Sequence, residues 1–156
     1  MFAGAFGHTY GHSCIWCMCT EQTDSRIMHW KAALNRSGAT QMKYLRKLME
    51  SRPVLERVPD HELLAENYPK ANHQQATRGN DYAFIYSPCG LKIKIKMGRI
   101  KGDKVRASWY NPRTGESSYI NDFENTGIVE FLPPSSGRNN DWVLVLDDAS
   151  GNYKLP

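Results

Sequence analysis

The first twenty residues contain no aspartate and no glutamate, and the first acidic residue of the chain is Glu21. Reactions in which one carboxyl group donates a proton while a second acts on the other side of the reacting bond require two acids held close together. Glu21 and Asp24 follow the acid-free stretch, but they lie in a polar loop without supporting groups. We interpret both as solvated loop residues, and we assign no catalytic residue.

Long apolar runs are also absent. The longest, such as Trp142–Leu146, are far too short to cross a bilayer, so we predict no membrane segment. The opening residues Met1–Ala5 have neither a basic region nor a continuous apolar region. They do not resemble a signal peptide.

No part of the chain carries a strong surplus of one charge sign. Lysine and arginine number 20 against 16 acids, and the net charge of +4 divides evenly between residues 1–74 and 75–156. Without a basic arm, we predict no nucleic-acid partner. Hydrophobic residues make up 40% of the chain and charged residues 23%, which favours a packed core over disorder.

Cysteines are few and unevenly placed: Cys14, Cys17 and Cys19 crowd together, and Cys89 stands alone. This spacing matches no regular disulfide framework. With His8 and His12 the cluster has the ligand types of a zinc site, but a second distant pair is missing. A zinc site and a Cys/His nucleophile remain alternatives to incidental buried thiols, and we predict no metal and no cofactor.

Residues 21–66 have a helical pattern. The predicted segments are a helix at Gly38–Ser51, a short turn at Trp30–Leu34 and another turn at 58–64. In the longest, apolar residues recur at helical spacing opposite a charged face. Pro53 ends that helix, and Asp60 is a candidate N-cap for the last turn.

Residues 75–148 instead show short strands separated by turn residues. The predicted strands are Ala76–Arg78, Tyr82–Ser87, Leu91–Met97, Val105–Tyr110, Ser117–Ile120, Ile128–Phe131 and Trp142–Leu146. Closely spaced strands without intervening helices predict an antiparallel sandwich, so the fold class is mainly β. The strand at 142–146 is apolar on both faces and should be central, and the tail after Asp148 should be loose.

Two features of the sandwich are candidates for surface binding. Lys92, Lys94 and Lys96 alternate with apolar residues and so share one strand face, either solvated or polyanion-binding. Trp109 and Tyr110 are adjacent on one strand, so they point to opposite faces. If one of them is exposed, Tyr110 is a candidate to stack against a sugar ring.

The N-terminal region lacks enough neighbours to cover its apolar side chains. One strand and one or two helices cannot bury Phe2, Phe6, Trp16 and the stripe of Met42, Leu45 and Met49. The sandwich can cover part of this surface. The simplest account is that a larger sheet with surrounding helices precedes Met1.

Two motif sets resemble the end of the apiosidase-like glycoside hydrolases. The first is residues 3–12, Ala-Gly-Ala-Phe-Gly-His-Thr-Tyr-Gly-His, followed by Ile15-Trp16. The second comprises Asp81–Ser87, Trp109–Gly115 and Asn140–Asp148. In that family a (β/α)8 barrel precedes a β-sandwich known as a "putative collagen-binding domain". The resemblance covers roughly residues 3–150, although cysteine is unusual in the family at positions 14, 17 and 19.

The resemblance implies a partial (β/α)8-barrel segment at residues 1–66, with residues 3–20 as the last strand and its loop. It implies a β-sandwich at 67–150 and a tail at 151–156. Strand ends build the active-site face of such barrels, so His8, Tyr10, His12 and Trp16 are candidates to line a sugar subsite. The family's catalytic carboxylates lie on earlier strands and match nothing here.

Two hypotheses for function follow. In the first, the chain is the C-terminal part of a glycosidase acting on plant-type polysaccharide, and its sandwich braces the barrel without being catalytic alone. In the second, the sandwich is a stand-alone module that binds glycan or, by its family label only, collagen. Relatives of this type are usually exported, so the resemblance implies an extracellular or periplasmic location.

Overall fold

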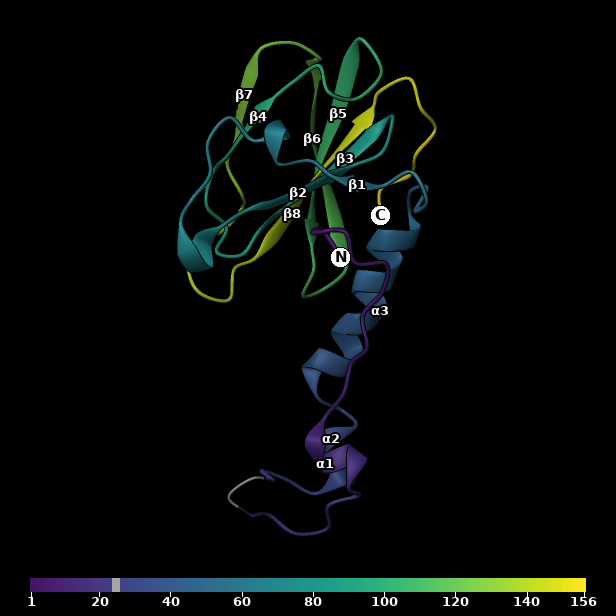
Figure 1. Ribbon diagram of the computed structural model, residues 1–156, viewed down its shortest axis with the longest axis vertical. Helices are drawn as coiled ribbons and strands as arrows, with labels where there is room; N and C mark the ends of the chain where they lie inside the picture. The colour runs from purple at the N-terminus through teal and green to yellow at the C-terminus, as the bar shows by residue number, and fades with distance from the viewer. Residues whose placement is uncertain (24–25) are drawn as a thin grey trace.

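The computed structural model describes residues 1–23 and 26–156, so the predicted loop acid Asp24 lies outside the described residues. A β-sandwich forms one end of the molecule, and helix α3 extends from it toward two short helices at the other end (Figure 1). The chain is therefore elongated, with nearly all of its strands in one compact part.

Eight strands form two antiparallel sheets. The larger sheet has the order β1 (Val58–Pro59), β2 (Gln75–Arg78), β3 (Tyr82–Ser87), β8 (Trp142–Asp148), β5 (Lys104–Asn111) and β6 (Glu116–Glu124). The smaller sheet pairs β4 (Ile93–Lys96) with β7 (Ile128–Phe131). All seven predicted strands are present, and β8 is central, between β3 and β5, as its apolar pattern predicted. The large sheet begins at Val58, inside the range that the sequence assigned to the barrel segment.

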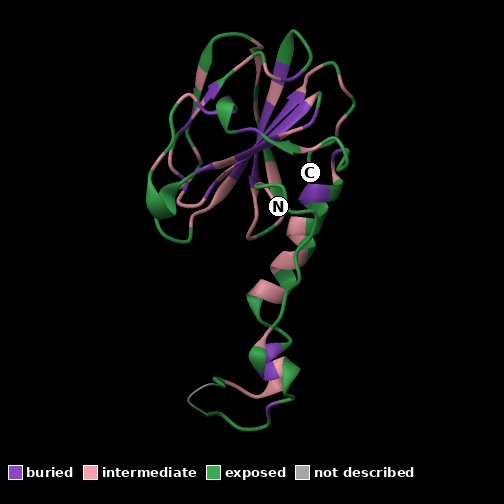
Figure 2. Cartoon of the chain, viewed as in Figure 1, coloured by how far each residue is buried: buried purple, intermediate pink, exposed green. Residues whose placement is uncertain are grey.

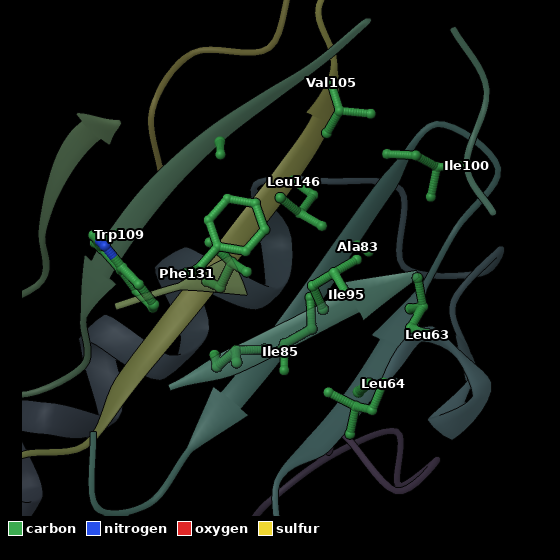
Figure 3. Packing of buried hydrophobic residues seen from close by; sticks show 14 residues of the cluster. Leu63, Leu64, Ala83, Ile85, Ile95, Ile100, Val105, Trp109, Phe131 and Leu146 are labelled. Atoms are coloured by element: carbon green, nitrogen blue, oxygen red, sulfur yellow. The ribbon is translucent and has the colours of Figure 1, made fainter. Parts of the chain in front are cut away.

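The main core lies between the two sheets (Figure 3). Ala83 and Ile85 of β3 and Leu146 of β8 point into it, together with Ile95 and Phe131 from the smaller sheet. Along β3 the intervening residues are also buried, so this strand is covered on both faces. The outer face of the large sheet must therefore have a cover of its own.

The helices are α1 (Ser13–Trp16), α2 (Trp30–Ala33), α3 (Ser37–Glu50) and the 3-10 turns η1 (His61–Leu63) and η2 (Lys70–Asn72). The predicted positions of α2 and α3 are confirmed to within a residue, whereas the turn predicted at 58–64 is shorter, because Val58 and Pro59 pair with β2 and the 3-10 turn covers only His61–Leu63. Asp60 caps η1 as predicted, because its Oδ1 accepts a hydrogen bond from the amide of Glu62 at 3.1 Å.

The strand expected within residues 3–20 is not formed. These residues contain no strand, and α1 occupies part of the stretch. Residues 1–12 instead run alongside α3 (Figure 1), with Tyr10 packed against Gly38. A barrel strand is held by hydrogen bonds to neighbouring strands on both sides, and no described residue provides them here.

The C-terminal tail is docked, where the sequence predicted a loose end. The hydroxyl of Tyr153 donates to both carboxylate oxygens of Asp81 at 3.0 Å, and the guanidinium of Arg52 lies 4.4 Å from the Tyr153 ring. Ser117 donates to the carbonyl of Pro156 at 2.6 Å. The local sequence predicted a loose tail because it does not show these contacts. They hold the tail in place, and they come from residues that are distant in the sequence.

Candidate functional site

Helix α3 covers the outer face of the large sheet and builds a second hydrophobic core there. Its buried members are Leu48, Met49, Tyr82, Phe84, Tyr110, Val143 and Val145, two from α3 and five from the sandwich. In Figure 2 the end of α3 that lies beside the sandwich is coloured as buried. The helical segment and the sandwich therefore share one core.

A buried ion pair closes one end of this junction. Arg52, just beyond α3, donates from Nε and Nη2 to the two carboxylate oxygens of Asp147, each at 2.7 Å. The side chains are only 2% and 7% exposed. A third donation reaches the carbonyl of Lys154 at 3.1 Å. Such a bidentate, desolvated pair fixes both distance and orientation between its two elements.

Two tyrosines of the sheet donate hydrogen bonds to the backbone of the helical segment. Tyr110 donates to the carbonyl of Tyr44 at 2.7 Å, and Tyr82 donates to the carbonyl of Pro53 at 2.5 Å. Burial raises the pKa of Tyr110 to about 12, since the phenolate would lose its hydration there. Burial also raises the pKa of Tyr82.

The β5–β6 turn is shaped to receive the helix. Gly115 takes the left-handed conformation that glycine adopts easily in a hairpin turn, with φ of 75°. A Cβ atom there would lie 2.3 Å from Cδ1 of Tyr44, so the bare glycine also makes room for that ring. Lys47 donates to the Gly115 carbonyl at 3.3 Å.

Tyr110 is therefore not a surface residue, and the candidate role in sugar stacking is wrong. Its neighbour Trp109 is 5% exposed and Tyr110 is fully buried. The alternation argument holds, because the two side chains do point to opposite faces. Trp109 is buried in the core between the two sheets, and Tyr110 is buried on the opposite face because α3 covers it.

Open cavities lie beside α3. The larger of two, about 660 Å³, lies between α3, the N-terminal residues and the sandwich loops. The second, about 480 Å³, lies between the N-terminal segment and α3. Among the described residues, Asp141 is the one acid lining the first cavity and Glu50 the one acid lining the second. Within residues 1–23 and 26–156, neither of these two cavities brings together the two carboxyl groups that glycoside hydrolysis usually uses.

Tyr86, Asp141 and Arg113 are polar residues that line the larger cavity. The sequence did not identify them as a site. Tyr86 donates to Asp141 at 3.3 Å, and burial, reinforced by that carboxylate, raises the pKa of Tyr86 to about 12. Arg113 donates to the carbonyl of Asn139 at 2.6 Å and stacks over the Trp142 ring at 5.3 Å. Arg113 lies in a turn, and these contacts are with residues more than twenty positions later in the chain. The local sequence therefore could not predict them.

The four residues predicted to line a sugar subsite do not meet in one place. His8 lines both cavities and Tyr10 lines the second. His12 is the N-cap of α1, with Nδ1 accepting from the amide of Cys14 at 3.2 Å. Trp16 is 77% exposed and packs over Gly11. Their role in sugar binding stays a prediction.

The lysine row follows β4 and continues just before it. Lys92 pairs with Glu130 at 3.3 Å, and Lys94 pairs with Glu66 at 3.1 Å. Lys94 donates this hydrogen bond to the Glu66 carboxylate, which stabilises the charged ammonium and raises the pKa of Lys94. Lys96 is exposed. Acids from β7 and from the segment before η2 thus offset much of this positive charge.

The structure also bears on the alternative sites. Within residues 1–23 and 26–156, no three His, Cys, Asp or Glu side chains gather as a metal site would require. All four cysteines are free thiols. No helix in the described ranges has the length and apolar character needed to span a membrane.

Comparison with known families now adds to this geometry. The family described as "Putative collagen-binding domain of a collagenase" matches residues 58–147, more than half of the chain. The chain belongs to this family. A second family, described as "Apiosidase-like, catalytic domain", matches residues 1–56. The predicted resemblance is confirmed: the collagen-binding-type sandwich follows directly on the end of an apiosidase-like catalytic domain.

Solved structures with the same arrangement are glycoside hydrolases. One, described as a glycoside hydrolase, shares 39% identity with a TM-score of 0.92, covering 98% of this chain and 35% of that one. A family 5 glycoside hydrolase from Bacteroides vulgatus shares 35% identity with a TM-score of 0.92, covering 98% and 34%. No curated protein matches significantly. This chain of the collagen-binding-type family thus spans about a third of the length of its solved relatives.

Proposed function

We propose that this chain serves as the C-terminal part of a carbohydrate-cleaving glycoside hydrolase, in which residues 1–56 complete the catalytic barrel and the sandwich braces them. One observation carries the proposal: α3 and the large sheet share a core and a buried ion pair. The helical segment occupies the outer face of the central strands, which is the arrangement expected of a sandwich that braces its neighbour.

The distribution of exposed apolar residues supports the barrel half of the proposal. Among the described residues, thirteen large hydrophobic residues are prominently exposed, and eight of them precede residue 56: Phe6, Tyr10, Trp16, Met18, Ile27, Leu34, Val54 and Leu55. Such a concentration marks a surface that another part of a protein covers. The solved relatives extend well beyond the part that this chain matches, and in this proposal the rest of the barrel supplies that cover.

The substrate class and location belong to the same proposal. A glycoside hydrolase acts on carbohydrate, and a plant-type polysaccharide is the substrate that the family resemblance suggests. An extracellular or periplasmic enzyme is suited to such a polymer. The isolated chain should show no hydrolysis, because the described residues bring one carboxylate to each of the two cavities beside α3 and the mechanism usually needs two.

A chimera tests the barrel half directly. This chain replaces the equivalent third of the Bacteroides vulgatus relative, and hydrolysis of a glycan that the intact relative cleaves is measured. We expect the chimera to retain activity, and the relative truncated at the same point to lose it. A chimera that folds, with native-like circular dichroism, but is inactive would contradict the assignment of residues 1–56. Glycan hydrolysis by the isolated chain would contradict the non-catalytic role.

A further inference from the structure

The end of the molecule farthest from the sandwich has very little core. We call residues 11–23 and 26–36 the foot, which holds α1 and α2 (Figure 1). Its buried cluster consists of Cys14, Cys19 and Ala33. Units this small rarely stay folded on apolar burial alone, and a cross-link is a common addition.

The backbone at the end of α1 brings Cys14 and Cys19 together. Met18 has φ of 45°, in the left-handed region. The amide of Cys19 donates to the carbonyl of Cys14 at 3.0 Å, and that of Met18 donates to the carbonyl of Ile15 at 3.1 Å. These two bonds and the left-handed residue form a Schellman motif, in which the first and last side chains commonly pack together.

The two thiols at those positions are also buried together. Cys14 is fully buried, Cys19 is 6% exposed, and both belong to the cluster of the foot. A disulfide needs Cα atoms about 4.4–6.8 Å apart and Cβ atoms on the same side. The direct backbone hydrogen bond keeps the two residues close together, and the shared cluster indicates that their side chains lie on the same side.

The other cysteines are placed differently. Cys17 is exposed, and its thiol lies 2.9 Å from the carbonyl of Ser13 on the outside of α1. Cys89 lies in the turn after β3, in the sandwich. Neither shares the buried cluster of the foot.

We propose that Cys14 and Cys19 form a disulfide that closes the end of α1. In the reduced chain the Cys19 thiol donates to the carbonyl of Glu21 at 2.6 Å, and the new bond replaces this contact. The oxidant is a small-molecule disulfide such as oxidised glutathione. One cysteine thiolate attacks it and releases one glutathione thiol. The other cysteine thiolate then attacks the mixed disulfide, forms the protein S–S bond and releases a second glutathione thiol.

The test is to refold the full chain in a buffer of reduced and oxidised glutathione and to count free thiols. Four are present in the reduced chain, and we expect two after refolding. The bond is located by cleaving separate samples after Trp16 and after Met18 without reduction. Only a bond between Cys14 and Cys19 keeps the flanking fragments joined in both samples.

Matched variants sharpen the result. Cys17→Ser should still form the bond and retain one free thiol, whereas Cys14→Ser and Cys19→Ser should each retain three. Four thiols in the refolded chain would overturn the proposal, as would a bond to Cys17 or Cys89 or a covalent dimer. If a variant fails to fold, the fragment map of the unsubstituted chain decides. The outcome is independent of the proposed hydrolase function.

Discussion

The sandwich and the helical segment before it bury their apolar side chains in different ways. The sandwich has a core of its own, in which fourteen buried residues lie between its two sheets or beside them. The helical segment has three buried residues in the foot and two more that are buried only against the sandwich. The sandwich can thus stabilise its neighbour, while the segment depends on surfaces outside itself.

The largest expected effect comes from breaking the ion pair that joins the two regions. Arg52→Ala leaves Asp147 buried without its partner, and removal of one member of such a pair costs about 3–5 kcal/mol. The free energy of unfolding is measured by urea denaturation. Arg46→Ala is the matched control, since the Arg46–Glu50 pair is 76% and 61% exposed and such pairs contribute about 0.3–0.5 kcal/mol. Equal effects of the two variants would show that the junction does not depend on this pair.

The next effect tests whether the second core is cooperative. Leu48 is 2% exposed, and Leu48→Ala should cost about 2–5 kcal/mol through lost burial and a cavity. The helical signal in circular dichroism and the fluorescence of the sandwich tryptophans should be lost in one transition. Leu55→Ala, at an 87% exposed position, is the control and should stay within about 0.5 kcal/mol. Separate transitions for helix and sandwich would contradict bracing.

A smaller and pH-dependent effect is expected at Tyr110. Tyr110→Phe removes the hydrogen bond to Tyr44 and should cost about 1 kcal/mol near neutral pH. Because the folded pKa of about 12 exceeds the usual value of about 10, this tyrosine stabilises the fold fully below pH 10. Its contribution is lost as the pH rises from about 10 through 12. Urea denaturation across that pH range should show that the difference in the free energy of unfolding between wild type and Tyr110→Phe becomes smaller. A difference that stays constant would contradict a buried phenol.

The same contrast explains what could be predicted from the sequence. The strands Tyr82–Ser87 and Ile128–Phe131 were predicted to the residue, because alternation and turn residues act over short distances. Tyr110 was misplaced because the helix that covers it lies more than sixty residues earlier. The tail was judged loose because Arg52 and Asp81, which hold Tyr153, are equally remote in sequence.

The strand expected within residues 3–20 was missed for a related reason. Its hydrogen-bonding partners would be other barrel strands, and the described residues do not contain them. The candidate sugar residues His8 and Tyr10 line cavities beside α3, whereas His12 and Trp16 belong to the foot. Sequence motifs therefore identified the family and the elements, but the contacts at the junction required the three-dimensional arrangement.

The smallest expected effect distinguishes bracing from binding. In the triple variant Lys92→Gln, Lys94→Gln and Lys96→Gln, we expect an unchanged melting temperature, because the lysines lie on an accessible face and their acid partners are solvated. Cosedimentation with fibrillar collagen and with an insoluble polysaccharide is measured for both proteins. If the sandwich only braces the barrel, neither the wild type nor the triple variant should sediment with collagen or with the polysaccharide. If the wild type sediments and the triple variant does not, the lysine row is a binding face and the binding-module hypothesis replaces bracing.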